Sequence, residues 1–212
     1  MKKNDSMIGL AKRLFPINRS ILGDGFKKSL SEIKKIHSDI KIHSIRSGTK
    51  VFDWTIPEEW NIKDAYLQHS SGKKYAKFKD HNLHIVGYSI PQNRTIDFKD
   101  LNKRIYTIPK KPDWIPYHTN YYKKDWGFCM SQKEKDRMPK GKYKVFIDSS
   151  FKKGDLQYGE LFLRGQSKKE IFFSTYLCHP SMANNELSGP VLSTFLISYI
   201  KKNYKNPKFS YR

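Results

Sequence analysis

The loop that follows the apolar run at residues 170–178 carries the side chains of this sequence best suited to chemistry. His179 stands directly after the run, and Asn185 and Glu186 follow within the same polar loop. An imidazole nitrogen and side-chain oxygens are donors that metal ions accept in proteins. In open α/β sheets, ligands bind in loops beyond the carboxyl ends of buried strands. We therefore take His179, Asn185 and Glu186 as candidate metal ligands. A structural reading stays open, in which His179 ends a strand and Asn or Ser caps a helix.

Three other groups of residues are weaker candidates. Cys178 and His179 form a thiol–imidazole neighbourhood, but strand neighbours point to opposite faces, so we interpret Cys178 as a buried apolar filler. His81 and His84 would share a face only on a helix, whereas this stretch is predicted to begin a strand. The aromatic and basic residues at 117–126 could stack on sugars or bases, although a packed structural loop is the favoured reading.

The pattern along the chain predicts an α/β fold interrupted by a β-rich block. Helices are expected at residues 5–15, with Met7, Ile8, Ala11, Leu14 and Phe15 on one face, and from Phe26 to about Ser38, followed by a strand at 41–45. Period-two or β-branched stretches predict strands at 51–56, 83–90, 143–148 and 156–163. The expected division is 1–49 and 156–212 for the α/β domain, with 50–155 as the inserted β domain.

The last part of the sequence predicts half of a βαβ unit around the candidate site. The continuous apolar run at 170–178 is typical of a strand buried on both faces. Gly189-Pro190 then opens a helix with one broad apolar face: Val191, Leu192, Phe195, Leu196, Tyr199 and Ile200. We expect this face to remain partly uncovered and to favour self-association.

The composition indicates which class of protein this is, but it does not indicate a function. Hydrophobic residues make up 37% of the 212 residues and aromatic residues 14%, which favours a folded chain. We expect no membrane span, no signal peptide and a cytoplasmic location, with Cys129 and Cys178 as free thiols. The net charge of +21 comes from lysine pairs dispersed along the chain, which favours a solvated surface over a nucleic-acid interface.

Several stretches together resemble a family of aminopeptidase-like proteins related to di-zinc exopeptidases. The loop at 178–189, CHPSMANNELSG, resembles the signature of that family. The similar stretches elsewhere are 14–25 (LFPINRSILGDG), 47–57 (SGTKVFDWTIP), 60–66 (WNIKDAY), 82–89 (NLHIVGYS), 113–117 (DWIPY) and 121–129 (YYKKDWGFC). The resemblance covers nearly the whole chain. It implies a zinc-exopeptidase-like α/β domain with an inserted β domain and, in longer members, a C-terminal winged helix.

The resemblance also implies a chemistry, with one departure. His179 matches the first metal-binding His, and Asn185 stands where the di-zinc enzymes place a bridging Asp. An amide offers one ligating oxygen and no charge, so Asn185 weakens the case for two zinc ions; Glu186 is a substitute donor. The remaining ligands and the general-base Glu are expected beyond Arg212, so we expect the 212-residue chain to bind zinc weakly and to be inactive alone.

Two functions follow from this reading. The first is a zinc-dependent hydrolase of peptide or amide bonds, with a small peptide, amide or glycan-linked substrate. The second is a non-catalytic module that binds carbohydrate or peptide. Members of the family are often encoded with enzymes of surface-polysaccharide biosynthesis, which the resemblance extends to this chain. Neither a membrane nor a nucleic acid is an expected partner.

Overall fold

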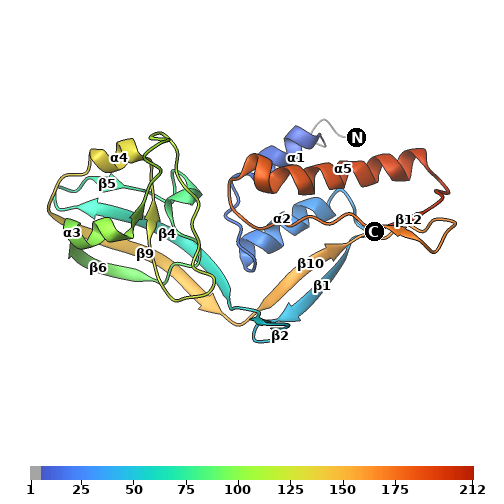
Figure 1. Ribbon diagram of the computed structural model, residues 1–212, viewed down its shortest axis with the longest axis horizontal. Coiled ribbons are helices and arrows are strands. Elements are labelled where there is room, and N and C mark those ends of the chain that lie inside the picture. The colour runs from blue at the N-terminus through green and yellow to red at the C-terminus, as the bar shows by residue number, and fades with distance from the viewer. Residues whose placement is uncertain (1–5) are drawn as a thin grey trace. The chain divides into compact units, whose positions relative to one another are not determined.

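The computed structural model describes residues 6–212, which form an α/β fold divided into two compact units (Figure 1). The first unit comprises residues up to Glu59 together with Lys153–Arg212, and the second comprises Trp60–Lys152. The sequence placed the corresponding boundaries at 49/50 and 155/156. Among the described residues, no helix is both long and apolar enough to cross a membrane.

The first unit combines three helices with short strands. Its elements are α1 (Met7–Leu14), α2 (Asp24–Lys34), β1 (Lys41–Arg46), β2 (Lys50–Val51), β3 (Trp54–Thr55), β10 (Asp155–Glu160), β11 (Glu170–Ile171), a π-helical turn η3 (Ala183–Leu187), α5 (Ser188–Asn203) and β12 (Ser210–Tyr211). β1 pairs antiparallel with β10, and β11 pairs parallel with β12. Leu10 and Leu14 of α1 pack against Leu187 and Val191, so α1 and α5 share one core cluster.

The second unit is built around a four-stranded sheet in the order β5-β4-β9-β6. Its elements are β4 (Glu59–His69), β5 (Lys74–Tyr75), η1 (Asn82–His84), β6 (Gln92–Asp97), α3 (Phe98–Leu101), η2 (Asn102–Arg104), β7 (Ile105–Tyr106), β8 (Phe128–Cys129), α4 (Gln132–Asp136) and β9 (Lys142–Lys152). In β9, Tyr143, Val145 and Ile147 are buried at alternate positions, as the period-two pattern predicts. This unit has a core of its own.

Two sequence predictions about helices are partly wrong. The first helix spans Met7–Leu14, and position 5, where we expected it to begin, lies outside the described residues. Its buried face holds Leu10 and Leu14, whereas Met7, Ile8 and Phe15 are exposed. α2 ends at Lys34, before the predicted end at about Ser38. Its predicted inward residues Phe26, Leu30 and Ile33 are buried, as is His37 beyond the helix.

Three strand predictions are wrong. Residues 51–56 are not one strand, because a turn at Phe52 and Asp53 separates β2 from β3. Residues 83–90 contain the short helix η1 and irregular backbone, and Tyr88 has a left-handed φ of 61° that interrupts an extended run. The predicted buried strand at 170–178 is a strand only at Glu170–Ile171, and residues 170–176 are exposed. An apolar run is buried only when neighbouring elements cover it, and β12 pairs with the beginning of this one alone.

The turn between α1 and α2 lies unusually close to the first turn of α2. A Cβ atom on Gly25 would lie 1.9 Å from the carbonyl oxygen of Asn18. Only glycine permits this approach, because the clashing atom belongs to the backbone and cannot rotate away. Gly25 thereby lets α2 fix the path of Asn18 and of Arg19, the residue after it.

We predict that Gly25→Ala lowers the free energy of unfolding of the first unit by about 1–3 kcal/mol, because the new methyl group displaces the backbone at Asn18. Urea denaturation followed by circular dichroism measures the change. The matched control is Lys28→Ala, an exposed site on the same helix that should change stability by less than about 0.5 kcal/mol. Equal effects of the two substitutions would contradict the close-approach explanation.

Candidate metal centre

The turn η3 sets the direction of the side chains that precede α5. The backbone N–H groups of Glu186 and Leu187 both donate to the carbonyl oxygen of Met182, at 3.1 and 3.2 Å, which produces a π-helical turn. Such turns are frequent at functional sites because they re-aim one side chain relative to a regular helix. Here Glu186 is buried at 1% exposure, whereas Asn184 and Asn185 are exposed. The turn therefore directs the candidate ligand Glu186 into the interior and leaves its neighbour Asn185 exposed.

His179 has a left-handed backbone conformation, which is unfavourable for a residue with a side chain. Its φ is +64°, and Ser181 two residues later has a φ of +48°. Non-glycine residues in this region are uncommon and need support from their surroundings. The N-terminal segment supplies that support: Arg19 Nη2 donates to the His179 carbonyl oxygen at 3.0 Å, and Ser181 Oγ donates to the Phe15 carbonyl oxygen at 3.0 Å. Residues at the two ends of the chain thus hold the loop in place.

Arg19 is the buried cation that makes these contacts. Its side chain is 1% exposed and also donates from Nη1 to the carbonyl oxygens of Leu14 and Ile17. Burial lowers the pKa of Arg19 to about 10, while the negative charge of Glu186 acts in the opposite direction. A buried guanidinium that remains charged needs a nearby anion, and Glu186 is that anion.

Three donor groups of different chemistry meet beside Arg19. Cys178 Sγ, a ring nitrogen of His179 and a carboxylate oxygen of Glu186 all lie within 4.8 Å of one another. His179 Nδ1 and Glu186 Oε1 are joined by a hydrogen bond. The second oxygen, Glu186 Oε2, is buried without a hydrogen-bond partner among the described residues. The thiol sulfur, the ring nitrogen and the incompletely hydrogen-bonded carboxylate together form a set of donors that suits a divalent transition metal.

The acidities of these groups are shifted in ways that bear on metal binding. Burial raises the pKa of Glu186, although its hydrogen bond to His179 and the charges of His179 and Arg19 lower it. Burial, followed by the Glu186 charge, raises the pKa of the Cys178 thiol to about 11. Without a metal ion the thiol therefore keeps its proton at neutral pH, and a metal ion must displace that proton to bind.

The sequence predictions for this site have different outcomes. The structure brings His179 and Glu186 together and leaves Asn185 exposed, so the metal role of Asn185 remains a prediction. The expectation that Cys178 and His179 point to opposite faces is wrong, because the segment before them is not a strand and His179 has a positive φ. Arg19 was not singled out, although its place in the N-terminal stretch at 14–25 was an available signal.

The weaker sequence candidates have structural contacts in the second unit. His84 Nδ1 lies 2.8 Å from the Cys129 carbonyl oxygen, and His81 Nδ1 accepts the Leu83 N–H at 3.1 Å within η1. In the aromatic stretch, the hydroxyls of Tyr117 and Tyr121 lie 2.9 Å apart. These contacts hold the loops of that unit together.

Comparison with known proteins identifies the family of this chain. The family described as a domain of unknown function, DUF4910, matches residues 8–212. The chain belongs to the DUF4910 family. A relative from Clostridium acetobutylicum is 48% identical over 203 residues, which are 96% of this DUF4910 chain and 46% of the relative. Its name assigns it to polysaccharide biosynthesis and gives it an aminopeptidase-like domain. The resemblance to aminopeptidase-like proteins is thereby confirmed.

Solved structures give the same picture of this DUF4910 chain. The crystal structure of a protein from Clostridium acetobutylicum, named a putative peptidase, matches with a TM-score of 0.91 at 47% identity, over 97% of this chain and 48% of the other. An aminopeptidase from Aneurinibacillus sp. strain AM-1 matches with a TM-score of only 0.46 at 11% identity, over 97% of this chain and 60% of the other. The chain spans about half the length of the Clostridium acetobutylicum proteins it matches.

We predict that Arg19→Met lowers the free energy of unfolding by about 3–5 kcal/mol, because it leaves the buried charge of Glu186 uncompensated. Urea denaturation in the presence of a chelator provides the measurement. Arg13→Met is the control, since Arg13 forms a partly exposed pair with Glu32 and should cost about 1 kcal/mol or less. In the Arg19→Met/Glu186→Gln double variant, part of the loss should be recovered; additive losses would show that the two residues do not interact.

We also predict a pH dependence that belongs to Glu186. Because burial raises its pKa above the ordinary 4.5, the folded protein binds more protons than the unfolded chain just above that pH. The contribution of Glu186 to stability therefore falls as the pH rises through this interval and is then constant. The stability of the natural chain minus that of Glu186→Gln, measured with a chelator from about pH 4 to about pH 8, should decrease with pH. A difference that increased with pH would contradict the raised pKa.

Proposed function

We propose that this chain contributes the first ligands of a metal-dependent centre that hydrolyses amide bonds, with zinc as the ion. The observation that carries the proposal is the buried carboxylate of Glu186, paired through one oxygen with His179 and unsatisfied at the other, beside the Cys178 thiol. A buried, unsatisfied carboxylate is costly for a protein unless a cation completes its contacts.

Cys178, His179 and Glu186 would hold the ion, and Asn185 is the nearest exposed oxygen donor in sequence. Three protein ligands are the number found in catalytic zinc sites, where the fourth position carries water. When bound, zinc supplies a water nucleophile at neutral pH and polarises the carbonyl group that is attacked. The residues of this chain would have other tasks: Cys178 gives up its thiol proton, His179 presents a ring nitrogen, and Arg19 stabilises the anionic form of Glu186.

The proposed substrate class follows from the relatives. The name of the Clostridium acetobutylicum relative joins polysaccharide biosynthesis to an aminopeptidase-like domain. We infer a small peptide or an amide attached to a glycan precursor as substrate. Because this chain corresponds to 46% of that relative, we place the general base and the remaining ligands in the part of the relative that has no counterpart here.

A second candidate function rests on Asn185. An amide at this exposed position cannot bridge two metal ions as a carboxylate does, and it offers both a donor and an acceptor for a ligand. A non-catalytic module that binds a carbohydrate or a peptide through the same loop would use those groups directly. The two candidates differ in whether a metal ion is needed for ligand binding.

We predict that the chain binds one zinc or cobalt ion, with a cobalt–thiolate charge-transfer absorption that identifies Cys178 as a ligand. His179→Ala and Cys178→Ser should each weaken zinc binding by at least about tenfold in equilibrium dialysis. Asn185→Asp should strengthen binding, whereas Asn184→Asp, its exposed neighbour, serves as the control. Chromogenic amino-acid amides should show no turnover with this chain alone.

Two results would reject the proposal. Zinc binding that His179→Ala and Cys178→Ser leave unchanged would place the ion elsewhere. Saturable binding of a carbohydrate or peptide in the presence of a chelator, reduced by Asn185→Ala but not by His179→Ala, would favour the non-catalytic module.

A further inference from the structure

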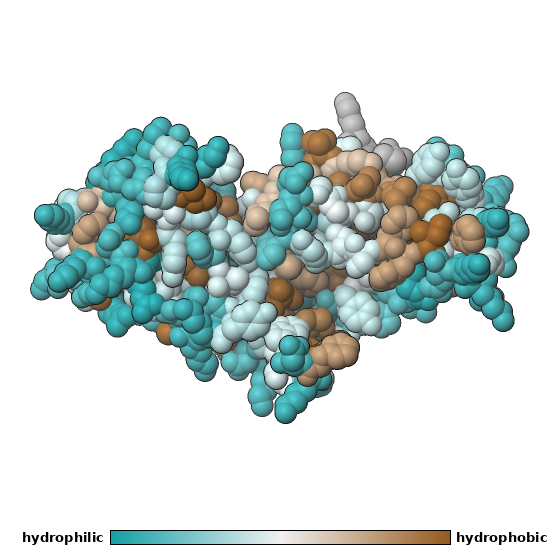
Figure 2. Space-filling model, in the orientation of Figure 1, coloured by the Kyte–Doolittle hydropathy of each residue, from teal (hydrophilic) through white to brown (hydrophobic). Residues whose placement is uncertain are grey.

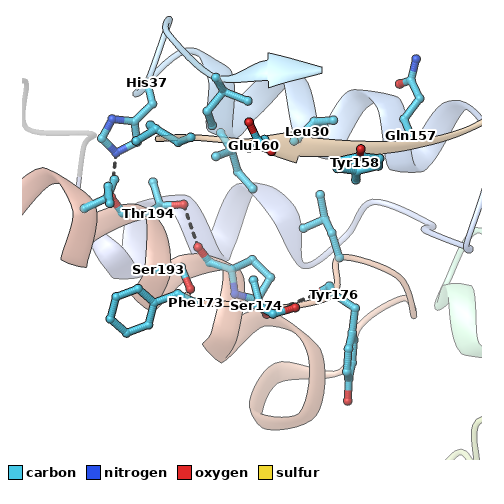
Figure 3. Close-up of a pocket in the computed structure, with 18 of the residues that line it drawn as sticks. Leu30, His37, Gln157, Tyr158, Glu160, Phe173, Ser174, Tyr176, Ser193 and Thr194 are labelled. Carbon is cyan, nitrogen blue, oxygen red and sulfur yellow. Dashed lines mark hydrogen bonds between the residues drawn. The ribbon is translucent and has the colours of Figure 1, made fainter. Parts of the chain in front are cut away.

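The two units of the chain differ in the chemistry that they offer to a ligand. The first unit contains a cavity of about 640 Å³ that is lined mainly by apolar side chains, and Figure 3 shows Leu30, Phe173 and Tyr176 among them. The second unit shows mostly hydrophilic side chains in Figure 2, and many of its exposed residues are lysines. A charged ligand is therefore matched better by the second unit.

The fold of the second unit brings together five lysines that are dispersed in the sequence. Lys73 and Lys74 come from β5 and the turn before it. Lys140, Lys142 and Lys144 come from β9 and the turn before it. All five are exposed, and we refer to them as the lysine cluster. Their proximity could not be seen in the sequence, where about 65 residues separate the two groups.

Contacts of the backbone hold the two lysine-bearing turns side by side. The Ser70 N–H donates to the Lys142 carbonyl oxygen at 3.0 Å, and His69 Nε2 lies 3.2 Å from the Lys140 carbonyl oxygen. Gly141 permits this approach, because its φ is +132° and a Cβ atom there would lie 2.8 Å from His69 Nε2. The turns are therefore positioned before a ligand binds, which lowers the entropic cost of binding.

Three members of the lysine cluster lie on one face of the sheet, beside two stacked rings. Lys142, Lys144 and Phe146 are two residues apart along β9, so they share the face opposite to its buried side chains. The rings of Tyr66 and Phe146 stack with their centroids 5.0 Å apart. Lys74 Nζ lies 3.9 Å from the Tyr66 centroid, and Lys144 Nζ lies 5.9 Å from the Phe146 centroid. The rings therefore restrict where these ammonium groups lie.

The carboxylates on the same face are fewer than the lysines of the cluster. Asp97 lies directly opposite Lys142 in the pairing of β6 with β9, and Asp148 follows further along β9. Asp64 of β4 already forms an ion pair with Lys79 at 3.2 Å. The surface thus carries an excess of positive charge, which suits an anionic ligand.

The neighbouring groups favour an acidic glycan over a nucleic acid. Because β4 lies between β5 and β9, Lys74 and Phe146 cover the two faces of the Tyr66 ring. This ring therefore offers no free face on which a base could stack. Asn93 and Thr95, exposed on the same face of β6, present neutral polar groups that suit the hydroxyl groups of a sugar.

We propose that the lysine cluster is a binding site for an acidic glycan, whose carboxylates pair with Lys74, Lys142 and Lys144 and whose hydroxyl groups bond to Asn93 and Thr95. Alternate residues of β9 are about 7 Å apart, so an extended polymer contacts more than one lysine. The site uses residues of the second unit alone. It is therefore independent of the metal-dependent function proposed for the first unit.

The test measures binding of a fluorescein-labelled oligogalacturonate to the full chain by fluorescence anisotropy. We expect saturable binding that weakens as salt is added, because the ion pairs are exposed. Lys74→Gln/Lys144→Gln should weaken binding by about tenfold or more. The control Lys34→Gln/Lys168→Gln removes the same charge from exposed positions of the first unit and should change the affinity by less than about threefold. Thermal melting of both variants shows that each is folded.

The possible results separate this site from its rivals. Weaker binding in Lys74→Gln/Lys144→Gln but not in the control supports the proposal. Equal losses in the two variants would overturn it, because the attraction would then come from the net charge of the whole chain. Absence of oligogalacturonate binding, or equal affinity for neutral dextran oligosaccharides, would also overturn it. Tighter binding of a single-stranded oligonucleotide of equal charge, weakened by the same substitutions, would identify a nucleic-acid surface instead.

Discussion

The buried guanidinium of Arg19 is the interaction on which the first unit depends. A charge in this position must be matched by acceptors and by an anion, and the acceptors come from the end of α1 and from the carbonyl oxygen of His179. One side chain therefore fixes the N-terminal helix, the left-handed backbone at His179 and the charge of Glu186 together. Gly25 also helps to position Arg19, because the absence of a Cβ atom lets the backbone of Asn18, the residue before Arg19, lie against α2. The metal loop has its shape because the N-terminal segment imposes it.

The metal loop follows a segment that little of the first unit covers. Residues 170–176 are exposed, and Cys178 and His179 come directly after the buried Leu177. Within residues 6–212, backbone hydrogen bonds hold this segment to Arg212 at Ile171 and Phe173. The conformation of the loop is therefore fixed by its contacts with Arg19 and Phe15 rather than by strand pairing of the residues before it.

Much of the fold could be predicted from local patterns, and the failures all involve distant contacts. The 3.6-residue period located α2 and α5, and alternation located β9, because both patterns reflect the burial of one face. The apolar run at 170–178 was misjudged, since sequence shows the tendency to be buried but not whether anything covers it. Cys178 was assigned to the wrong face because strand geometry was assumed for a segment that is not a strand. Arg19 belongs to no periodic pattern, and its role in the metal loop depends on the His179 carbonyl group and the Glu186 charge, both far along the chain.

The separation of Arg19 and His179 by 160 residues also has a consequence for biogenesis. Ribosomes make the N-terminal helices first, and the second unit is then completed before the carbonyl group that Arg19 needs exists. Throughout that interval the guanidinium must stay hydrated, so α1 cannot settle into its final place against α5. Contacts of such long range form slowly and leave apolar helix faces exposed meanwhile. The nascent chain should therefore depend on chaperones most strongly until the loop at residues 179–187 has left the ribosome.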